Sequence, residues 1–288
     1  MPNSVAVILP TYNNLDSLKL CLSSLEAQTF SDFTAYVCID GSTDGTIEYL
    51  ESAKFSFQFK VLEHADKKNK GRQATRNLAL RITKESFILF LDSDVQVNPN
   101  WIEEHINELE KHPITIGRVH YTNYENPWVD YYNSRGYNST RLKQHVNSRF
   151  YISTNSGFRK EVFEDVGVMD ESIKVYGGDA EFALRLTHFG YTKVSYLPNA
   201  VSFGTESKTV KEAMNQYEQF SRYLLQNLIK QYPNNQDYFN YSKLKKLRFL
   251  KFTNLNYVAE VLGNEKPGIL TRIGIRILLT LALIKEIR

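Results

Sequence analysis

The sequence predicts an α/β fold, with a mostly parallel, Rossmann-like central sheet, helices on both faces and a helical C-terminal extension. Three observations support this prediction. Short apolar runs alternate with stretches of helical spacing through the first 112 residues, as expected for successive βαβ units. The apolar runs are continuous, which is typical of strands buried on both faces. From about residue 206 the sequence has helical character to its end.

Four strands and four helices are expected in these first 112 residues. The strands are the apolar runs at 5–9, 33–40, 57–63 and 87–91. The helices are expected at 15–28, from a cap at Ser42 or Thr43 to 52, at 72–83 after Gly71, and at 100–112 after Pro99. A proline at the start of a helix is favourable because its missing N–H would have no partner there.

The sequence changes character after about residue 114. The segment 121–137 is aromatic and polar without a clear period, so we expect a long loop or short helices over a site. Beyond it, we expect strands at 149–158 and 192–198 and helices at 159–167 and 178–190. We therefore divide the chain into an α/β domain at 1–205 and a helical extension at 206–288.

The composition excludes several classes of protein. With 42% hydrophobic and 23% charged residues among 288, the chain is expected to fold and not to remain disordered. Cys21 and Cys38 lie in apolar stretches and are expected to be reduced core residues. We see no secretory signal, and no apolar run reaches the roughly 18 residues of a membrane-spanning helix. We therefore expect a cytoplasmic protein.

The two parts of the chain differ in charge. Residues 206–288 hold 14 Lys and Arg against 7 Asp and Glu, a net charge of +7, whereas residues 1–205 hold 21 against 25, a net charge of −4. This asymmetry indicates an anionic partner for the extension, and we expect a membrane surface and not nucleic acid. The alternative is a solvated helical face.

The last helical stretch, 269–288, combines apolar and basic residues at helical spacing. These are Ile269, Ile273, Ile277, Leu281 and Ile284, with Arg272, Arg276 and Lys285 on or beside the opposite face. The stretch is too short to span a bilayer, but it can lie in the interface of an anionic membrane. The protein would then be peripheral on the inner face of the cell membrane. The alternative is burial against the body or in a homodimer.

Polar side chains follow three of the predicted strands. The segment 10–13 follows the first strand, Asp40 ends the second, and Asp92 and Asp94 end the fourth. In open α/β sheets, ligands bind outside the carboxyl ends of the strands. Two Asp residues one position apart can hold a hard divalent cation through oxygen, with phosphates and water completing the shell. We therefore expect a nucleotide diphosphate and Mn²⁺ or Mg²⁺ in this crevice.

Other well-known sites are not indicated. The sequence has no G-x-G-x-x-G after a strand, no P-loop, no nucleophile elbow and no zinc spacing of Cys and His. The histidines show no ligand spacing, and we assign no role to them; they include His112, His120, His145 and His188.

Six segments occur in an order and spacing typical of one family. They are VAVILPTYNN, CIDGSTDGT, GRQATRN, LFLDSDV, TNSGFRKEVFEDVGVMDE and YGGDAEFALRL. Over roughly residues 4–200 the chain resembles the inverting nucleotide-sugar glycosyltransferases of family 2. The resemblance implies a GT-A fold and sugar transfer from a nucleotide donor, expected to be UDP-linked. The acceptor would be a hydroxyl group of a glycan, or one linked to lipid or protein, in polysaccharide synthesis.

The resemblance also implies which residues bind the donor. Thr11 and Tyr12 match positions that line the nucleoside pocket, and Asp40 matches the aspartate that reads the base, usually a uracil. Arg72 and Arg76 lie in a segment that often borders the nucleotide; the alternative is a solvated helix face. The candidate donor-binding residues are Pro10, Thr11, Tyr12, Asp40, Arg72, Arg76, Asp92 and Ser93.

Metal binding and catalysis are assigned by the same resemblance. Asp94 matches the direct metal ligand, and Asp92 matches a residue near the ribose or in the outer metal shell. Asp179 matches the catalytic base, with Glu181 as the second candidate. Inverting transfer needs one carboxylate to take the proton of the acceptor hydroxyl.

The sequence departs from the family pattern at three places. Ile39 and Gly178 stand where the family often has acidic residues. Many relatives also have a third metal ligand, a His, in the region matching 199–206, where Gly204 or Ser202 stands nearest and Glu206 is a candidate substitute.

Alternatives remain for the residues and for the whole protein. Asp92 and Asp94 suit a turn, Asp40 a helix cap, and Asp179 the first turn of a helix. The protein could instead be an inactive scaffold that binds glycans or nucleotide sugars. A sugar-phosphate nucleotidyltransferase is the other alternative, although such enzymes usually have an early Gly-rich basic loop.

Overall fold

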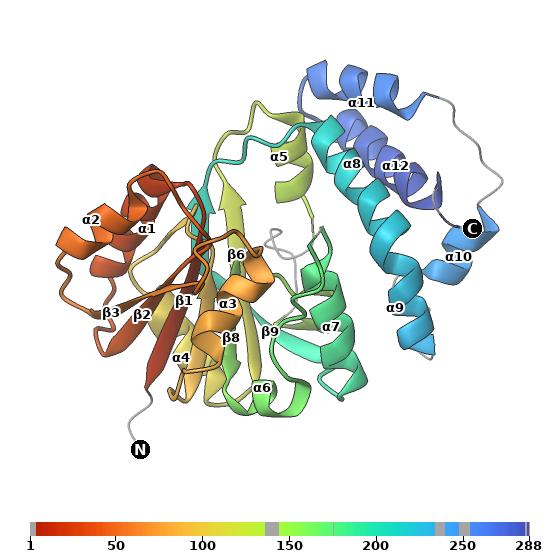
Figure 1. The fold of residues 1–288 in the computed structure, drawn as a ribbon. Coiled ribbons are helices and arrows are strands. Elements are labelled where there is room, and N and C mark those ends of the chain that lie inside the picture. Colours follow the sequence, from red (N-terminus) through yellow and green to blue (C-terminus); the bar gives the residue numbers. More distant parts are fainter. Residues whose placement is uncertain are drawn as a thin grey trace.

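The computed structural model describes residues 4–135, 144–174, 176–233, 240–247, 254–285 and 287. Its described strands form one sheet in the order β3–β2–β1–β4–β8–β6–β9–β5, with β7 paired to β9 (Figure 1). Helices lie on both faces of this sheet, and the C-terminal helices gather at one side of it. The predicted α/β class is therefore confirmed.

The N-terminal part of the sheet is parallel. Its strands are β1 (Val5–Thr11), β2 (Phe33–Ile39), β3 (Gln58–Glu63) and β4 (Phe87–Leu91). The connecting helices are α1 (Leu15–Glu26), α2 (Thr46–Ser52) and α3 (Arg72–Leu80). Helix α2 begins later than predicted. The Asp44 carboxylate accepts hydrogen bonds from the N–H groups of Leu15 and Thr46, at 2.8 and 3.3 Å, and keeps the preceding turn outside the helix.

The second part of the sheet is mixed. Strand β8 (Asn155–Arg159) lies antiparallel between β4 and β6 (Ile114–Tyr121), and β9 (Lys193–Gly204) is parallel to β6. The short strands β5 (Gln96–Val97) and β7 (His145–Asn147) pair antiparallel with β9. The helices of this part are α4 (Trp101–Leu109), α5 (Pro127–Asn133), α6 (Glu161–Val166) and α7 (Gly178–His188).

The strand predictions need correction. Strands β5, β6 and β7 were not predicted, and the predicted strand 149–158 is a strand only from Asn155, because residues 148–150 form a 3-10 turn. Gly117 interrupts the apolar pattern of β6 at the point where the register against β9 shifts. A Cβ atom at Gly117 would lie 2.3 Å from the Ala200 carbonyl oxygen, so this crowded crossing requires glycine.

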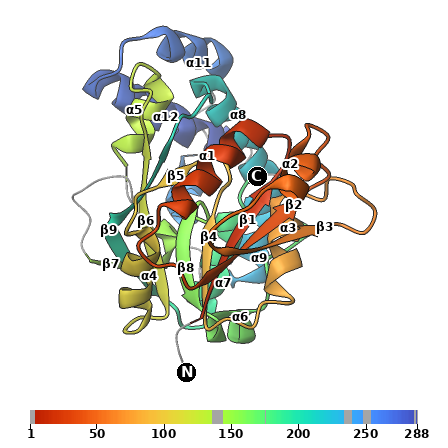
Figure 2. The same ribbon diagram turned by 90° about the vertical axis from the view of Figure 1, so that its left-hand side faces the viewer.

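Alternate residues of β1 separate two hydrophobic cores, as expected for a strand covered on both faces. Val5, Val7 and Leu9 pack with α1, α2 and α4, whereas Ala6 and Ile8 pack with α3, α6 and α7. Figure 2 shows the two helical layers on either side of the sheet. The covered strands explain why the apolar runs in the sequence are continuous.

The C-terminal helices pack on the α/β body through two further hydrophobic clusters. The helices are α8 (Val210–Gln219), α9 (Gln226–Gln231), α10 (Tyr241–Lys246), α11 (Leu255–Asn264) and α12 (Ile269–Lys285), with a π-helical turn at Phe220–Leu225. One cluster joins α8, α11 and α12 to Trp128 and Tyr131 of α5, and the other joins the π-helical turn and α9 to Leu184 of α7. Arg272 of α12 also pairs with Asp130 of α5.

Helix α12 has two apolar faces. Ile275, Leu278, Leu279 and Ala282 are buried against its neighbours, whereas part of the predicted apolar stripe faces outward. In the part of the chain that the structure describes, no helix has both the length and the apolarity needed to cross a bilayer.

Asn155, at the start of β8, holds four parts of the fold together. It is fully buried, and its side-chain oxygen accepts a hydrogen bond from Trp101 Nε1 at 2.8 Å and lies 3.0 Å from His105 Nε2. Its Nδ2 donates to the carbonyl groups of Arg118 and Ala200, at 3.1 and 3.0 Å. The side chain therefore connects α4, β6 and β9.

We predict that Asn155→Ala lowers the free energy of unfolding by about 3 kcal/mol or more, because each buried polar group left without a partner costs about 1–3 kcal/mol. Urea denaturation would measure this loss. The control is Asn199→Ala, at an exposed position, which should stay within about 0.5 kcal/mol of the wild type. Equal effects of the two substitutions would contradict the role of Asn155.

Candidate functional site

The carboxyl ends of β1, β2 and β4 meet in a hydrogen-bond network. The Asp40 N–H donates to the Thr11 carbonyl oxygen at 2.9 Å. Ser93 Oγ donates to the Pro10 carbonyl oxygen and accepts from Asn14 Nδ2, both at 2.8 Å. Pro10, Thr11 and Ser93 are buried and shape this edge of the sheet from inside.

Tyr12 and Asp40 lie at the same edge but differ in exposure. Tyr12 is 51% exposed, whereas Asp40 is 3% exposed. The Asp40 carboxylate accepts hydrogen bonds from the N–H groups of Lys70 and Gly71, at 2.7 and 3.1 Å, and lies 3.4 Å from His64 Nε2. Asp40 therefore fixes the loop that leads into α3.

Arg76 is 1% exposed, packs over the ring of Phe90 and pairs with Asp92 Oδ1 at 2.5 Å. The other carboxylate oxygen of Asp92 accepts from Thr154 Oγ1 at 2.7 Å. Burial alone would raise the pKa of Asp92, but the positive charges of Arg76 and Arg72 outweigh it and lower the pKa. Asp92 is thus an ionised acid with both oxygens bound inside the protein.

Asp94 has a different environment. It is exposed, and among the described residues no side chain forms a hydrogen bond or ion pair with its carboxylate. Partial burial of the carboxyl group and the negative charge of Asp92 raise its pKa to about 6, and Glu206 adds to this effect. A positive charge here would be stabilising.

Arg72 lies close enough to three of the candidate carboxylates for their charges to act on it. It stands exposed at the start of α3. Partial burial lowers its pKa, but the negative charges of Asp92, Asp179 and Asp94 outweigh it, so that the pKa is raised. The structure thus brings the end of β4 and the start of α7 to one guanidinium group.

The two candidate bases on α7 differ in the groups that bind their carboxylates. Asp179 is half-buried, and its Oδ2 accepts from the Ser153 N–H at 3.2 Å. Glu181 is buried and binds Arg185 through both oxygens, at 2.8 and 3.0 Å. Glu181 therefore belongs to an internal ion pair that holds α7, whereas Asp179 faces the group of charges around Arg72.

The sequence analysis did not identify four residues of the site. Ser153 and Thr154 contact Asp179 and Asp92, and Tyr151 lies close enough to Asp179 for that charge to contribute to the raised pKa of its phenol, which is mainly due to burial. Gln73 is buried in α3, and its Nε2 lies 1.8 Å from where a Cβ atom at Gly178 would stand. Their only local signal was proximity to predicted motifs.

The structure shows what surrounds Gly178 and Gly204, the two glycines at which the sequence departs from the family pattern. Gln73 fills the space into which a longer side chain at Gly178 would project. A Cβ atom at Gly204 would lie 3.0 Å from the Asp94 carbonyl oxygen, so this position is beside Asp94 but supplies no side chain. Glu206 binds Lys208, at 3.3 Å, and acts on Asp94 by its charge.

These residues fit a divalent cation held mainly by Asp94. Among the described residues no side chain binds its carboxylate, and burial together with the negative charge of Asp92 raises its pKa. Mg²⁺ and Mn²⁺ prefer such oxygen ligands and accept water and phosphate for the rest of their shell. Asp92 fits an outer position, because its oxygens are bound to Arg76 and Thr154.

Comparison with known proteins identifies the sequence family. The model of the family described as glycosyl transferase family 2 matches residues 6–167, more than half of the chain. The chain is 28% identical to the glycosyltransferase AglE of Haloferax volcanii over 194 residues, which are 65% of this chain and 62% of that relative. It is 33% identical over 129 residues, 42% of this chain and 46% of the relative, to the UDP-Glc:alpha-D-GlcNAc-diphosphoundecaprenol beta-1,3-glucosyltransferase WfgD of Escherichia coli. It thus spans less than two thirds of each relative's length.

Solved structures share the fold. Residues 1–349 of TarS from S. aureus in complex with UDP-GlcNAc give a TM-score of 0.61 at 18% identity, covering 90% of this chain and 80% of that one. The mannosyltransferase PcManGT from Pyrobaculum calidifontis, in complex with GDP-Man and Mn²⁺, gives 0.62 at 18% identity, covering 98% and 86%. Both support the predicted GT-A arrangement. The family match over residues 6–167 shows that the chain belongs to glycosyl transferase family 2.

Proposed function

We propose that the protein is an inverting glycosyltransferase that moves a sugar from a UDP-linked donor to a hydroxyl group of a growing glycan. The observation that carries this proposal is the placement of Asp92 and Asp94 directly after β4, where their charges, with that of Asp179 in the first turn of α7, act on Arg72. Family membership supports the reaction class. The UDP-linked donors named for WfgD and for the TarS complex support the choice of nucleotide.

The donor would lie along the ends of β1, β2 and β4. Tyr12 is exposed and can stack on a base, and the buried Asp40 holds the loop at 70–71 that would form the other side of the pocket. Arg72 is the exposed cation next to the expected diphosphate, whereas Arg76 acts indirectly by holding Asp92. A divalent cation bound at Asp94 would neutralise charge on the diphosphate leaving group.

Asp179 is proposed as the general base. It would accept the proton of the acceptor hydroxyl as that oxygen attacks the anomeric carbon and the bond to the diphosphate breaks. The Ser153 N–H holds one carboxylate oxygen of Asp179 and orients the other. Glu181 is a poor candidate for this role because both of its oxygens bind Arg185.

We also propose that the outer face of α11 and α12 lies on an anionic membrane. Its exposed apolar residues are Tyr257, Val258, Val261, Ile269, Leu270, Ile273 and Ile277. The exposed basic residues Lys266 and Arg276 lie in the same region, and the extension carries a net charge of +7. Apolar contact and charge attraction together favour such surfaces. The site would then be near a lipid-linked acceptor.

The base assignment is tested by Asp179→Asn. This change keeps the shape of the side chain but removes its ability to accept a proton, so we expect transfer to fall by a factor of about 10² to 10⁴ with UDP-sugar binding nearly intact. Release of UDP in the presence of acceptor glycans measures the rate. Glu181→Gln is the comparison and should lower the melting temperature while keeping activity per folded molecule. Full activity in Asp179→Asn would refute the assignment, and no UDP release by the wild type with any acceptor would favour a scaffold.

The metal assignment is tested by Asp94→Asn. We expect Mn²⁺ to strengthen UDP binding to the wild type by at least about tenfold over a chelator control, because the cation bridges the carboxylate and the diphosphate. Asp94→Asn should remove this gain. Asp32→Asn changes an exposed acid at the opposite end of the sheet and should keep it. Equal UDP affinity with metal and with chelator, measured by calorimetry, would contradict a metal site at Asp94.

Liposome flotation tests the membrane proposal. The wild type should float with anionic vesicles, less so at high salt, and should not float with neutral ones. Ile269→Glu combined with Ile273→Glu should abolish flotation, because both side chains are more than half exposed on the proposed face. Leu20→Glu, at an exposed position on α1, is the matched control. A wild type that stays in the soluble fraction as a stable dimer would indicate that the face binds a second copy.

A further inference from the structure

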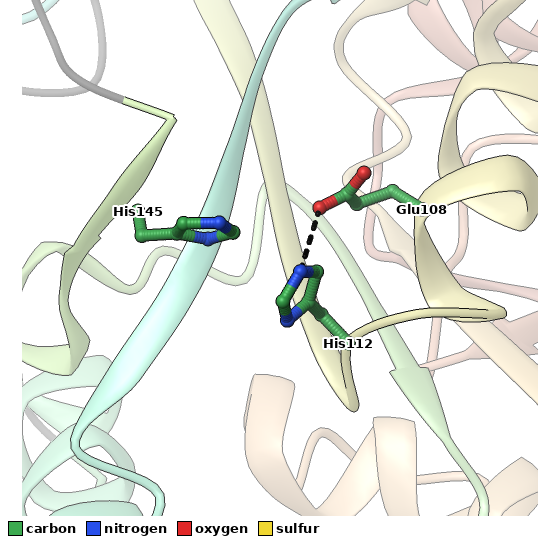
Figure 3. Close-up of side chains that lie close together, drawn as sticks. All are labelled: Glu108, His112 and His145. Atoms are coloured by element: carbon green, nitrogen blue, oxygen red, sulfur yellow. Dashed lines mark ion pairs between the residues drawn. The ribbon is translucent and has the colours of Figure 1, made fainter.

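Two histidines without ligand spacing in the sequence meet in the structure. His112 follows α4, His145 begins β7, and their ring centroids lie 4.4 Å apart. Glu108 of α4 completes the group, and one ligand atom from each residue lies within 4.8 Å of the others (Figure 3). We propose that Glu108, His112 and His145 bind a Zn²⁺ ion.

Glu108 provides the strongest reason for a cation. It is 7% exposed, and its Oε1 is buried without a hydrogen-bond donor in the described structure. This oxygen lies 3.6 Å from His112 Nε2, which is too long for a hydrogen bond. A buried carboxylate without a donor is unfavourable. A metal ion between the carboxylate and the imidazoles would offset this penalty.

His145 is oriented by a neighbour in the way that metal-binding histidines usually are. Its Nδ1 lies 3.1 Å from Ser195 Oγ of β9. A hydrogen bond at one ring nitrogen fixes the ring and leaves the other nitrogen to bind metal.

The donor set selects zinc over the metals expected at Asp94. Two imidazoles and one carboxylate form a common zinc site, with bonds of about 2.0–2.2 Å and water in the fourth position. Imidazole nitrogen suits Zn²⁺, whereas Mg²⁺ and Mn²⁺ prefer oxygen. The two sites are also separated in the fold. His145 pairs with Ser195 near the start of β9, whereas Gly204, beside Asp94, is at the end of this strand.

The ion would join α4 to the edge strand β7. From β7 the chain runs through the 3-10 turn at 148–150 to Ser153 and Thr154, which contact Asp179 and Asp92. Zinc would therefore anchor one end of the segment that orients two acids of the candidate active site. The bound ion would stabilise this part of the fold, because a folded state that binds an ion is stabilised by it.

The test uses the full-length protein without a purification tag, stripped with chelator and titrated with Zn²⁺ by calorimetry. We expect one Zn²⁺ per chain, retained on dialysis by elemental analysis, and a higher melting temperature. His145→Ala should weaken zinc binding by at least about 100-fold. Loss of a residue that hydrogen-bonds to a metal ligand already costs up to about this factor, and loss of the ligand itself should cost at least as much. Its exposed position makes damage to the fold a poor explanation for such a loss.

Two controls separate this site from other sources of zinc binding. His188→Ala, on α7, removes a histidine that contacts Phe189 and Tyr232, and should bind zinc like the wild type. Asp94→Asn should also keep the zinc. Co²⁺ bound in place of zinc should give the visible absorption of a tetrahedral site, which His145→Ala should lose. No retained zinc in the wild type, or equal binding by His145→Ala and His188→Ala, would overturn the proposal.

Discussion

Arg76 lies in α3 beneath the carboxyl end of β4, with 1% of its surface exposed, and its guanidinium binds the carboxylate of Asp92. Because a charge removed from water must be compensated, loss of either partner would cost about 3–5 kcal/mol. The same carboxylate accepts a hydrogen bond from Thr154. One buried pair therefore ties a helix of one face, the central strand and the segment leading into β8. The position of the crevice depends on this connection.

The carboxylates of the crevice are of two kinds, which differ in their hydrogen-bond partners. Asp40, Asp92 and Glu181 are satisfied by backbone N–H groups, hydroxyls or arginines, and they hold loops and helices in place. Asp94 has no side-chain partner in the described structure and is bound only by its own N–H, and Asp179 accepts from one N–H. Carboxylates whose oxygens are not all bound by the protein can bind a cation or accept a proton at the end of the sheet. This division supports Asp94 and Asp179 for chemistry and the other three for support.

The C-terminal helices form part of the surroundings of this crevice. Gly177, two residues before Asp179, has a φ of +122°, and a Cβ atom there would lie 2.5 Å from the Phe220 ring. Tyr176 stacks with Tyr217 of α8 at 5.9 Å. A groove lined by polar residues of the segment 206–208 and of α8 begins at Glu206, whose charge acts on Asp94.

The sequence by itself determined the βαβ rhythm, the strand ends at Asp40, Asp92 and Asp94, and the family, because these depend on local periodicity and on motifs within short segments. Tertiary structure decided what the same residues do. Arg72 and Arg76 share one helix, yet one is exposed among carboxylates and the other is buried, since only the packing of α3 on β4 distinguishes them. Strand β6 was not predicted because Gly117 interrupts its apolar pattern, and this glycine is required by the close contact with β9. His112 and His145 meet only because the sheet places the end of α4 beside β7. Such contacts are made by residues distant in sequence, and no local pattern encodes them.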